Sequence, residues 1–275
     1  MSESLAIDFL YKTPVGRFIL KGLVNPKVSK RAAKILSSRM SAAFVPSFIR
    51  KNHIDIDDYI VPEGGFGSFN DFFTRKIKPG KRAIGDSTFI CPSDGLLTVS
   101  GISETSVFNI KNTSYSLKEL LDDENLAGEF IGGTALIFRL TPSHYHRYVF
   151  CTSGKITDKK FIQGILHSVK PVCHEMFPVF IQNSREYAVI DSEEYGKTVQ
   201  MEVGALLVGK ISNRGYSIGD VACKGEEKGY FEYGGSSIVV LTKQKLCENP
   251  DQTEEIPVKL GEDITKTGFV CLTKI

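Results

Sequence analysis

The amino-acid sequence predicts an α+β fold in which N-terminal amphipathic helices are followed by an antiparallel β-sandwich or barrel-like core. Three observations predict it. Apolar residues recur at helical spacing through the first sixty residues, a Gly-rich loop follows, and the rest of the chain consists mainly of short β-rich runs separated by Gly, Pro, Asn and Asp. With 275 residues, 41% of them hydrophobic and 24% charged, the chain can bury a substantial core and is not composed like a disordered protein.

The helical region is predicted to be divided into short helices by Pro14, Pro26 and Pro46. Apolar side chains share one face in each of two stretches, 15–23 and 36–44, and basic residues occupy much of the remaining surface. The loop at 61–67 then gives two predicted domains, a helical membrane-facing segment at 1–60 and a second domain at 61–275.

Charge is distributed unevenly along the chain. Residues 1–53 hold ten Lys or Arg against two acidic residues and so carry +8, which leaves −6 on the remainder because the whole chain carries +2. A basic end favours an anionic partner, either a membrane surface or a nucleic acid, and no nucleic-acid-binding motif is present. Helices that pack on the domain and turn a basic face to water would give the same pattern.

The second domain is predicted to be built from short strands. One short helix interrupts them at Leu117–Leu126, and no repeats are found. The clearest predicted strands are Thr134–Leu140, Tyr187–Ile190, Thr198–Val203, Leu206–Ile211 and Ser237–Thr242.

Cysteine usage and hydropathy favour an intracellular protein. The six cysteines are scattered without a C-x-x-C pair, which is typical of a reducing compartment. No apolar run is long enough to span a bilayer, and the N-terminus lacks the pattern of a signal peptide. We therefore expect an intracellular protein bound peripherally to the cytoplasmic face of a membrane.

The Gly235-Ser236 pair can carry an unusual chemistry. Taken alone, it is a Gly-rich turn that enters a buried strand. A serine hydroxyl can also attack the carbonyl of its own preceding residue, and glycine there tolerates the backbone strain this requires. Elimination from the resulting ester and loss of ammonia leave an N-terminal pyruvoyl group, whose ketone can react with a substrate amine and act as an electron sink for decarboxylation.

Six segments, in the same order along the chain, resemble motifs of the phosphatidylserine decarboxylase family. They are F-N-D-F-F-T-R-K-I-K-P-G-K-R at 69–82, C-P-S-D-G at 91–95, R-L-T-P-S-H-Y-H-R at 139–147, H-S-V-K-P at 167–171, V-G-A-L-L-V-G at 203–209 and K-G-E-E-K-G-Y-F-E-Y-G-G-S-S at 224–237. The resemblance implies a pyruvoyl-dependent enzyme that cuts itself between Gly235 and Ser236 and then converts phosphatidylserine to phosphatidylethanolamine and CO2.

The resemblance also implies roles for individual residues. Ser236 becomes the pyruvoyl group, Asp94 assists self-cleavage by orienting a histidine, and His146 takes part in decarboxylation. His167 and Ser168 are expected to bind substrate. Read without the resemblance, Asp94 is a turn residue and His146 a structural histidine. No metal or added cofactor is implied, but a homodimer is, in which the chains 1–235 and 236–275 stay associated.

This chain departs from the family pattern at the residue expected to be the base. The family commonly reads Y-H-R-x-H, and Val149 stands in place of the second histidine. His144 replaces the usual aspartate, and on an extended strand it would point to the same side as His146, so we expect it to supply the base. His167 or His174 could do so if the fold brings either close. Nothing else with zinc spacing accompanies His144 and His146, which argues against a metal site.

Three alternative functions follow from these departures. A pyruvoyl decarboxylase of a soluble amino acid is favoured by the changed histidine and by Lys210 at a position where the family has serine. A lipid-binding homologue that does not process itself is favoured by Val149. A membrane-surface scaffold that merely retains the fold is the third.

Overall fold

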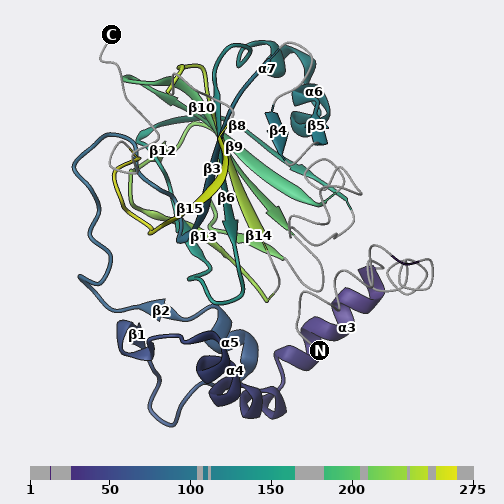
Figure 1. The fold of residues 1–275 in the computed structure, drawn as a ribbon, viewed down its shortest axis with the longest axis vertical. Helices are drawn as coiled ribbons and strands as arrows, with labels where there is room; N and C mark the ends of the chain where they lie inside the picture. The colour runs from purple at the N-terminus through teal and green to yellow at the C-terminus, as the bar shows by residue number, and fades with distance from the viewer. Residues whose placement is uncertain are drawn as a thin grey trace.

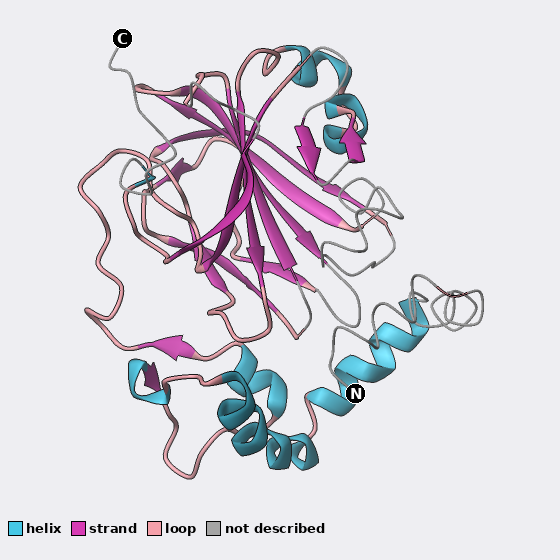
Figure 2. Cartoon of the chain, viewed as in Figure 1, coloured by secondary structure: helices cyan, strands magenta, loops and turns pink. Residues whose placement is uncertain are grey.

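The computed structural model describes residues 13, 26–103, 108–110, 113–164, 183–204, 210–233, 236–246 and 252–264. Its largest element is an eight-stranded sheet in which every pair of neighbours is antiparallel (Figures 1 and 2). In spatial order the strands are β12 (Val221–Ala222), β8 (Gly154–Ile162), β9 (Arg185–Ser192), β10 (Gly196–Gly204), β14 (Ser236–Thr242), β6 (Thr134–Leu140), β3 (Gly95–Gly101) and β15 (Gln252–Val258).

A second, three-stranded sheet covers one face of the large sheet. Its strands, in spatial order, are β11 (Ile211–Asn213), β13 (Glu227–Phe231) and β7 (Arg147–Val149). Tyr148 and Phe231 from this sheet join Phe138, Leu140 and other large-sheet residues in one buried apolar cluster. The two sheets therefore pack face to face, as expected when each has one apolar face to remove from water.

Two short helices cover the opposite face of the large sheet. They are α6 (Leu117–Leu121) and α7 (Glu124–Gly128), which lie beside the small hairpin of β4 (Phe108–Ile110) and β5 (Thr113–Tyr115) in Figure 1. Their leucines pack with large-sheet residues such as Val239 and Met201 in a second buried cluster. Alternation along β14 sends Val239 and Leu241 to this face and Ile238 and Val240 to the face that meets the three-stranded sheet.

The N-terminal helices form a layer below the sheets in Figure 1. They are α3 (Pro26–Leu36), the 3-10 helix η1 (Arg39–Phe44), α4 (Val45–Asn52), the 3-10 helix η2 (Ile56–Asp58) and α5 (Phe69–Phe73), and strand β1 (Tyr59–Ile60) pairs with β2 (Lys76–Ile77). The 61–67 loop joins β1 to α5. An aromatic cluster made by α4 and α5, with Phe48, Phe69, Phe72 and Phe73, fixes the layer on both sides of that loop.

These results confirm the α+β fold with a large antiparallel sheet. Strand Thr134–Leu140 has the predicted bounds, and β9, β10 and β14 extend their predictions by one to a few residues. The predicted helix at Leu117–Leu126 is instead two helices, because Asp122 takes a left-handed conformation with φ 50° and the Asp123 side chain caps α7 by accepting from Leu126 N. The predicted helix across 15–23 and most of the predicted strand at 206–211 fall outside the described residues.

Candidate functional site

Ser236 is the first residue of β14, and that strand is hydrogen-bonded on both sides. The residue lies opposite Gly204 of β10 and Leu140 of β6. Its side chain is fully buried and shares the face of Ile238 and Val240, toward the three-stranded sheet. Its hydroxyl has no hydrogen-bond partner among the described residues. Burying an unpaired hydroxyl costs roughly 1–3 kcal/mol, so packing alone gives no reason for a serine here.

Asp94 directly precedes β3, the strand beyond β6. Its carboxylate accepts two hydrogen bonds from the Arg82 guanidinium, at 3.1 Å from Nε and 2.8 Å from Nη2, and a third from Leu260 N at 2.9 Å. Both side chains are nearly buried, and this bidentate pairing raises the pKa of Arg82. The prediction that Asp94 orients a histidine finds no support in these contacts, because all three of its hydrogen bonds go elsewhere.

His146 is fully buried at the start of the three-stranded sheet, where its carbonyl accepts from Phe231 N at 2.9 Å. Its Nδ1 lies 2.9 Å from the His144 carbonyl, which can only accept, so Nδ1 carries the proton. In the neutral ring Nε2 is then a free lone pair, and it is buried with no partner among the residues described. Burial lowers the pKa of His146 well below its usual 6.5 and keeps the ring neutral.

His144 has the opposite tautomer. It lies in the turn between β6 and β7 rather than on a strand, and its ring folds back so that Nδ1 accepts from Thr141 N at 2.9 Å. The expectation that His144 and His146 point to the same side of one strand is therefore wrong. Burial lowers the pKa of His144, and the negative charge of Asp94 opposes this.

The three predicted catalytic positions meet at one end of three neighbouring strands. Ser236 begins β14, the histidine turn follows the last residue of β6, and Asp94 precedes the first residue of β3. Since neighbouring strands are about 4.8 Å apart, the backbones of Ser236 and the start of β3 are separated by about 10 Å, with the histidine turn between them. This arrangement brings a hydroxyl, an imidazole and a carboxylate into one buried region.

Comparison with known proteins decides the family. A model of the phosphatidylserine decarboxylase family matches residues 69–266, which include all of these positions. The chain is 42% identical to phosphatidylserine decarboxylase proenzyme 2 of Clostridium acetobutylicum, covering 95% of this chain and 92% of that one. It is 40% identical to the phosphatidylserine decarboxylase proenzyme of Chlamydia muridarum, covering 96% and 91% of the two chains.

The chain belongs to the phosphatidylserine decarboxylase family. A third relative, the proenzyme of Ruminiclostridium cellulolyticum, is 38% identical over 96% of this chain and 86% of its own. Within the family pattern, the position of the usual second histidine is occupied here by Val149, which packs with Leu260, Ile90 and Tyr145 in an apolar cluster. Val149 N donates to Pro92 O, two residues before Asp94. An apolar side chain thus lies beside the Asp94 segment, where the family commonly has a base.

The remaining predicted site residues are not described by the structure. His167 and Ser168 lie in 165–182, and Gly235 lies just before the first described residue of β14. His174, named as a possible base, lies in the same segment as His167. Their proposed roles stay predictions.

Sequence reasoning gave no role to three residues that the structure places at the site. Arg82 binds Asp94, the Phe73 ring stacks on His146 with centroids 3.9 Å apart, and Arg75 donates to the His144 carbonyl at 3.3 Å. All three belong to the first of the six motifs. That motif could have singled out the segment, but nothing in the sequence shows which histidine or carboxylate each residue contacts.

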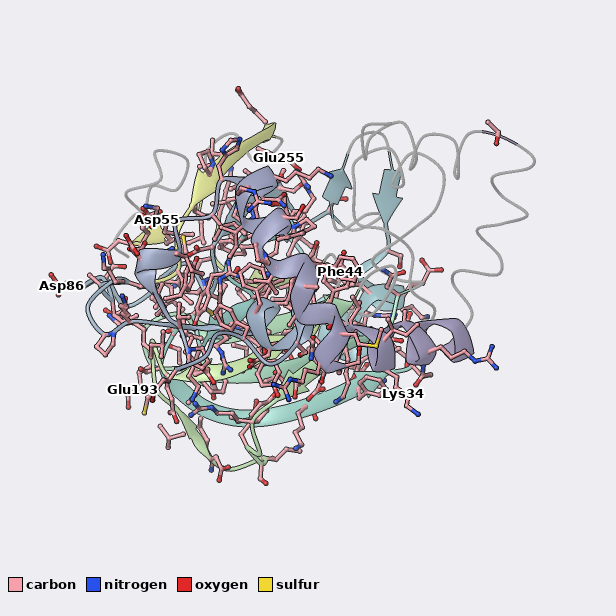
Figure 3. The ribbon with its side chains drawn as sticks, turned by 90° about the horizontal axis from the view of Figure 1, so that it is seen from below. Lys34, Phe44, Asp55, Asp86, Glu193 and Glu255 are labelled. Atoms are coloured by element: carbon pink, nitrogen blue, oxygen red, sulfur yellow. The ribbon has the colours of Figure 1, made fainter. Side chains whose placement is uncertain are left out.

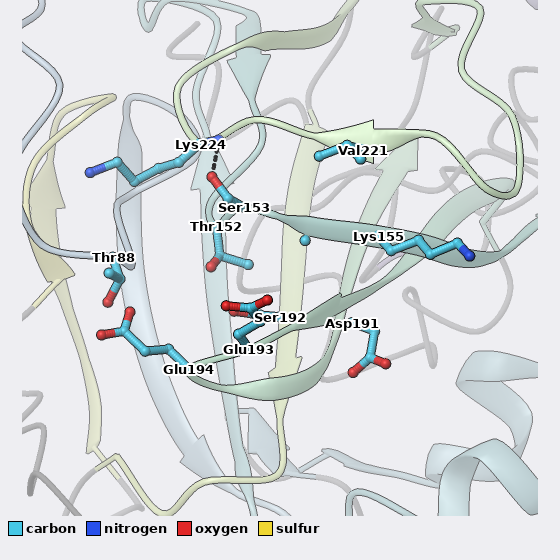
Figure 4. A pocket seen from close by; sticks show the side chains of 11 residues that line it. Thr88, Thr152, Ser153, Lys155, Asp191, Ser192, Glu193, Glu194, Val221 and Lys224 are labelled. Carbon is cyan, nitrogen blue, oxygen red and sulfur yellow. Dashed lines mark hydrogen bonds between the residues drawn. The ribbon is translucent and has the colours of Figure 1, made fainter.

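A cavity of about 620 Å³ lies far from this region (Figure 4). It is lined by Ser192 and acidic residues at the end of β9, and Lys224 N donates to Ser153 Oγ at its rim. Ser192 pairs with Gly196 at one end of β10, whereas Ser236 pairs with Gly204 at the other. Those ends are separated by about 26 Å at 3.3 Å per residue, so this cavity does not belong to the Ser236 site.

Proposed function

We propose that this protein is a phosphatidylserine decarboxylase that generates its own pyruvoyl group by cleavage between Gly235 and Ser236. The observation that carries the proposal is that Ser236, His146 and Asp94 lie at one end of three neighbouring strands, and that Ser236 Oγ and His146 Nε2 are buried without a partner among the described residues. The names of the relatives support both the substrate and the proenzyme form.

In self-cleavage Ser236 Oγ attacks the carbonyl carbon of Gly235. The hydroxyl proton passes to a base and the Ser236 nitrogen is protonated as its amide bond breaks, leaving an ester. Removal of the Ser236 α-proton then expels the Gly235 carboxylate and leaves dehydroalanine at the start of the smaller chain. Water adds to the imine form of this group, and loss of ammonia leaves the ketone of the pyruvoyl group. A buried hydroxyl without a competing hydrogen bond suits the first step, because nothing has to be displaced before it reacts.

His146 is the base that the geometry favours. The role requires a free lone pair, which His146 has at Nε2, whereas the Nδ1 lone pair of His144 is already used by Thr141 N. His144 could accept a proton only by giving up that hydrogen bond. We therefore assign base and decarboxylation roles to His146, and a supporting role to His144 through the proton on its Nε2.

The surroundings of Ser236 also suit the group it would become. The pyruvoyl ketone would take up the substrate amine and draw electrons from the bond to the departing carboxyl group. Ser236 is fully buried opposite Leu140 and faces the cluster that contains Phe231, so this environment excludes water from the reacting carbon. Asp94, held by Arg82, supplies a fixed negative charge at the edge of the same region.

The N-terminal helices support contact with an anionic membrane. Residues 26–52 contain seven Lys or Arg and no Asp or Glu. Three apolar side chains on α3 and η1 are exposed to water, with Ile35 at 63%, Met40 at 86% and Phe44 at 62%, and Figure 3 shows Phe44 and Lys34 on these helices from below. Apolar side chains flanked by basic ones bind the headgroup region of a bilayer. In the described part of the chain, no helix is long and apolar enough to cross a membrane.

The two product chains are proposed to stay together after cleavage. The smaller chain, 236–275, begins with β14, which is paired along its length to β10 and β6 of the larger chain. A homodimer, a cytoplasmic membrane face and the two-domain division at residue 60 rest on the family resemblance and the sequence pattern, and they stay predictions.

The deciding experiment is the intact mass of the purified protein with Ser236 present and with Ser236→Ala. We expect the parent to give two chains cut after residue 235, the smaller one lighter by one ammonia than a serine-initiated fragment, and Ser236→Ala to stay whole. Ser100→Ala is the matched control, because Ser100 is also buried and unpaired but lies near the other end of β3. It should be cut normally.

A parent protein that remains uncut would overturn the proposal in favour of a homologue that binds lipid without processing itself. The apolar packing of Val149 and the pairing of Asp94 with Arg82 are the observations that favour that second function. Decarboxylation of phosphatidylserine and of free serine by the cut protein would then separate the lipid substrate from a soluble one.

A further inference from the structure

Arg75 is a buried arginine that has no carboxylate partner among the described residues. It is 2% exposed and lies between the end of α5 and β2, and none of the ion pairs found among the described residues includes it. Its Nε is also buried and unpaired. Burying a positive charge without a neutralising partner lowers the stability of the folded protein. Such a charge is therefore often retained for a functional reason, and packing alone does not explain this one.

The guanidinium of Arg75 is held rigidly by aromatic rings and carbonyls. Its central carbon lies 4.2 Å from the centroid of the Tyr59 ring and 4.7 Å from that of Phe72. Its terminal nitrogens donate to the carbonyls of Phe72, Ser143 and His144 at 3.3–3.4 Å. The rings leave the charge un-neutralised, and the carbonyl contacts fix the turn that carries both histidines.

The carbonyl of His144 receives two donors at once. Arg75 Nη2 donates to it from one segment and His146 Nδ1 from the other. On the imidazole face, the Phe73 ring of α5 lies 3.9 Å away, centroid to centroid, with 34° between the planes. The segment from Phe73 to Arg75 therefore fixes the carbonyl that selects the tautomer of His146 and the plane of its ring.

Among the described residues, two charged or titratable groups act on His146, namely Arg75 and His144. Arg75 comes from the segment after α5, and His144 from the turn before β7; on the α5 side the ring meets Phe73. Burial lowers the pKa of His146 most, and the positive charge of Arg75 lowers it further. The negative charge of Asp94 is engaged by Arg82 and acts on His144.

We propose that Arg75 is a positioning residue for the Ser236 site, one that keeps His146 neutral with Nε2 as a free lone pair. It does so by anchoring the His144 carbonyl that takes the Nδ1 proton and by placing an un-neutralised positive charge beside the ring. The proposal rests on the assignment of His146 as base, and the hydrogen bonds of Arg75 go to backbone carbonyls and not to Ser236.

Two variants separate the charge of Arg75 from its shape. Arg75→Met removes the charge, so His146 should bind a proton more readily, and the acid limb of the cleavage-rate profile should move to higher pH by about one unit. Arg75→Lys keeps a charge but loses the planar set of donors, so it should slow cleavage while leaving the acid limb in place. The rate is followed by mass spectrometry after cell-free synthesis at a series of pH values.

Arg185→Met is the matched control for loss of a buried arginine. Arg185 is 3% exposed and also donates to backbone carbonyls, those of Leu120 and Glu119, but it lies opposite Val203 on the other face of the large sheet. Its loss should lower stability without moving the acid limb.

A direct measurement keeps the test independent of cleavage. In the uncut Ser236→Ala protein, 15N NMR of the histidine rings should show His146 protonated at Nδ1 only, and Arg75→Met should raise the pH at which its second nitrogen takes a proton. An unchanged His146 titration in Arg75→Met, or a proton on Nε2 of the parent, would overturn the proposal. Failure of the parent protein to cut itself would instead count against the proposed function, whatever the NMR shows.

Discussion

At the scale of single residues, the site is marked by polar atoms that lack partners. Ser236 Oγ and His146 Nε2 are buried without a partner among the described residues, and the nearby Asp94 carboxylate is engaged by Arg82 and Leu260 N. Seven other buried polar atoms of the described residues, Arg75 Nε among them, also lack a partner, so what singles out Ser236 Oγ and His146 Nε2 is where they lie. Their position at neighbouring strand ends supports a reaction between them.

The buried, neutral His146 should make folding stability depend on pH. The unfolded histidine binds a proton near pH 6.5 and the folded one binds it only at much lower pH, so the unfolded state holds more protons below 6.5. The free energy of unfolding of the Ser236→Ala protein should therefore fall as pH drops from 6.5 to 5, by up to about 1.4 kcal/mol per pH unit from this residue. Urea titrations at several pH values measure it.

The comparison variants for that experiment are His146→Gln and His53→Asn. The first should flatten the dependence between pH 6.5 and 5, since it removes the buried histidine. The second replaces an exposed histidine in a left-handed conformation, which asparagine tolerates, and should leave the slope as it was. Equal slopes for His146→Gln and the parent would count against a neutral His146 in the folded protein.

Residue types and motif order predicted Ser236, Asp94 and His146, but could not predict their contacts. The partner of Asp94 is Arg82, twelve residues earlier, and the base role at His146 depends on which of its nitrogens faces a carbonyl. Both depend on the directions that side chains take in the folded protein, which the sequence does not show. The substitution at Val149 was visible in the sequence, but its packing against Leu260 was not.

At the scale of elements, α5 connects the N-terminal helical layer to the proposed site. Phe73 contacts both His146 and Tyr233, which lies three residues before Ser236, and Asn70 Oδ1 accepts from Tyr233 N at 3.1 Å. On its other side α5 packs on α4, and Phe69 N at the start of α5 donates a hydrogen bond to Ser41 Oγ of η1. The five-residue helix thus contacts both the proposed base, His146, and the segment that precedes the proposed cleavage point.

The exposed apolar residues of η1 should determine membrane binding. The double variant Met40→Ser and Phe44→Ser should bind vesicles containing phosphatidylserine at least tenfold more weakly. Full burial of one such side chain in the membrane contributes about 1.5–3 kcal/mol, and about 1.4 kcal/mol corresponds to a tenfold change in affinity. Phe161→Ser on β8 is the control, since Phe161 is 56% exposed but lies away from the basic helices. Sedimentation with vesicles measures the binding.

Binding by the parent should also weaken as salt rises, because the basic side chains of the segment whose exposure is described, Arg31, Lys34, Arg39, Arg50 and Lys51, are exposed to water and so to screening by salt. If the double variant binds as well as the parent while Phe161→Ser binds less, then the membrane contact lies on the sheet side of the molecule and not on these helices.

Among the elements, the long strands were predictable and the short helices were not. Short, nearly continuous apolar runs at Thr134–Leu140 and Ser237–Thr242 identify strands, because each buries side chains on both faces of a central sheet. The 36–44 stretch has apolar residues at helical spacing, yet it is divided between the end of α3 and η1, and Met40 and Phe44 face water. Periodicity alone cannot tell an apolar face that is buried from one left exposed.

At the scale of the whole molecule, the large sheet is assembled from both sides of the proposed cut. β14 lies between β10 and β6 in the middle of the eight strands, and β15 closes one edge by pairing with β3. Both strands belong to the chain that starts at Ser236, while the other six belong to the chain that ends at residue 235. This strand order could not be predicted from the sequence, because pairings between strands far apart in the chain depend on the packing of the whole core.

The central place of β14 should make refolding of the cut protein differ from folding of the uncut chain. The uncut chain folds with β14 already tethered, but two separate chains would have to find each other and insert a middle strand between partners that would first have to be apart. We expect the Ser236→Ala protein to regain its structure after dilution from denaturant and the cut protein not to, as circular dichroism would show. A cut protein that refolds fully would refute this. On this view the cut protein is kinetically stable: it persists because it unfolds slowly, and once unfolded it cannot fold again by the route that the uncut chain took.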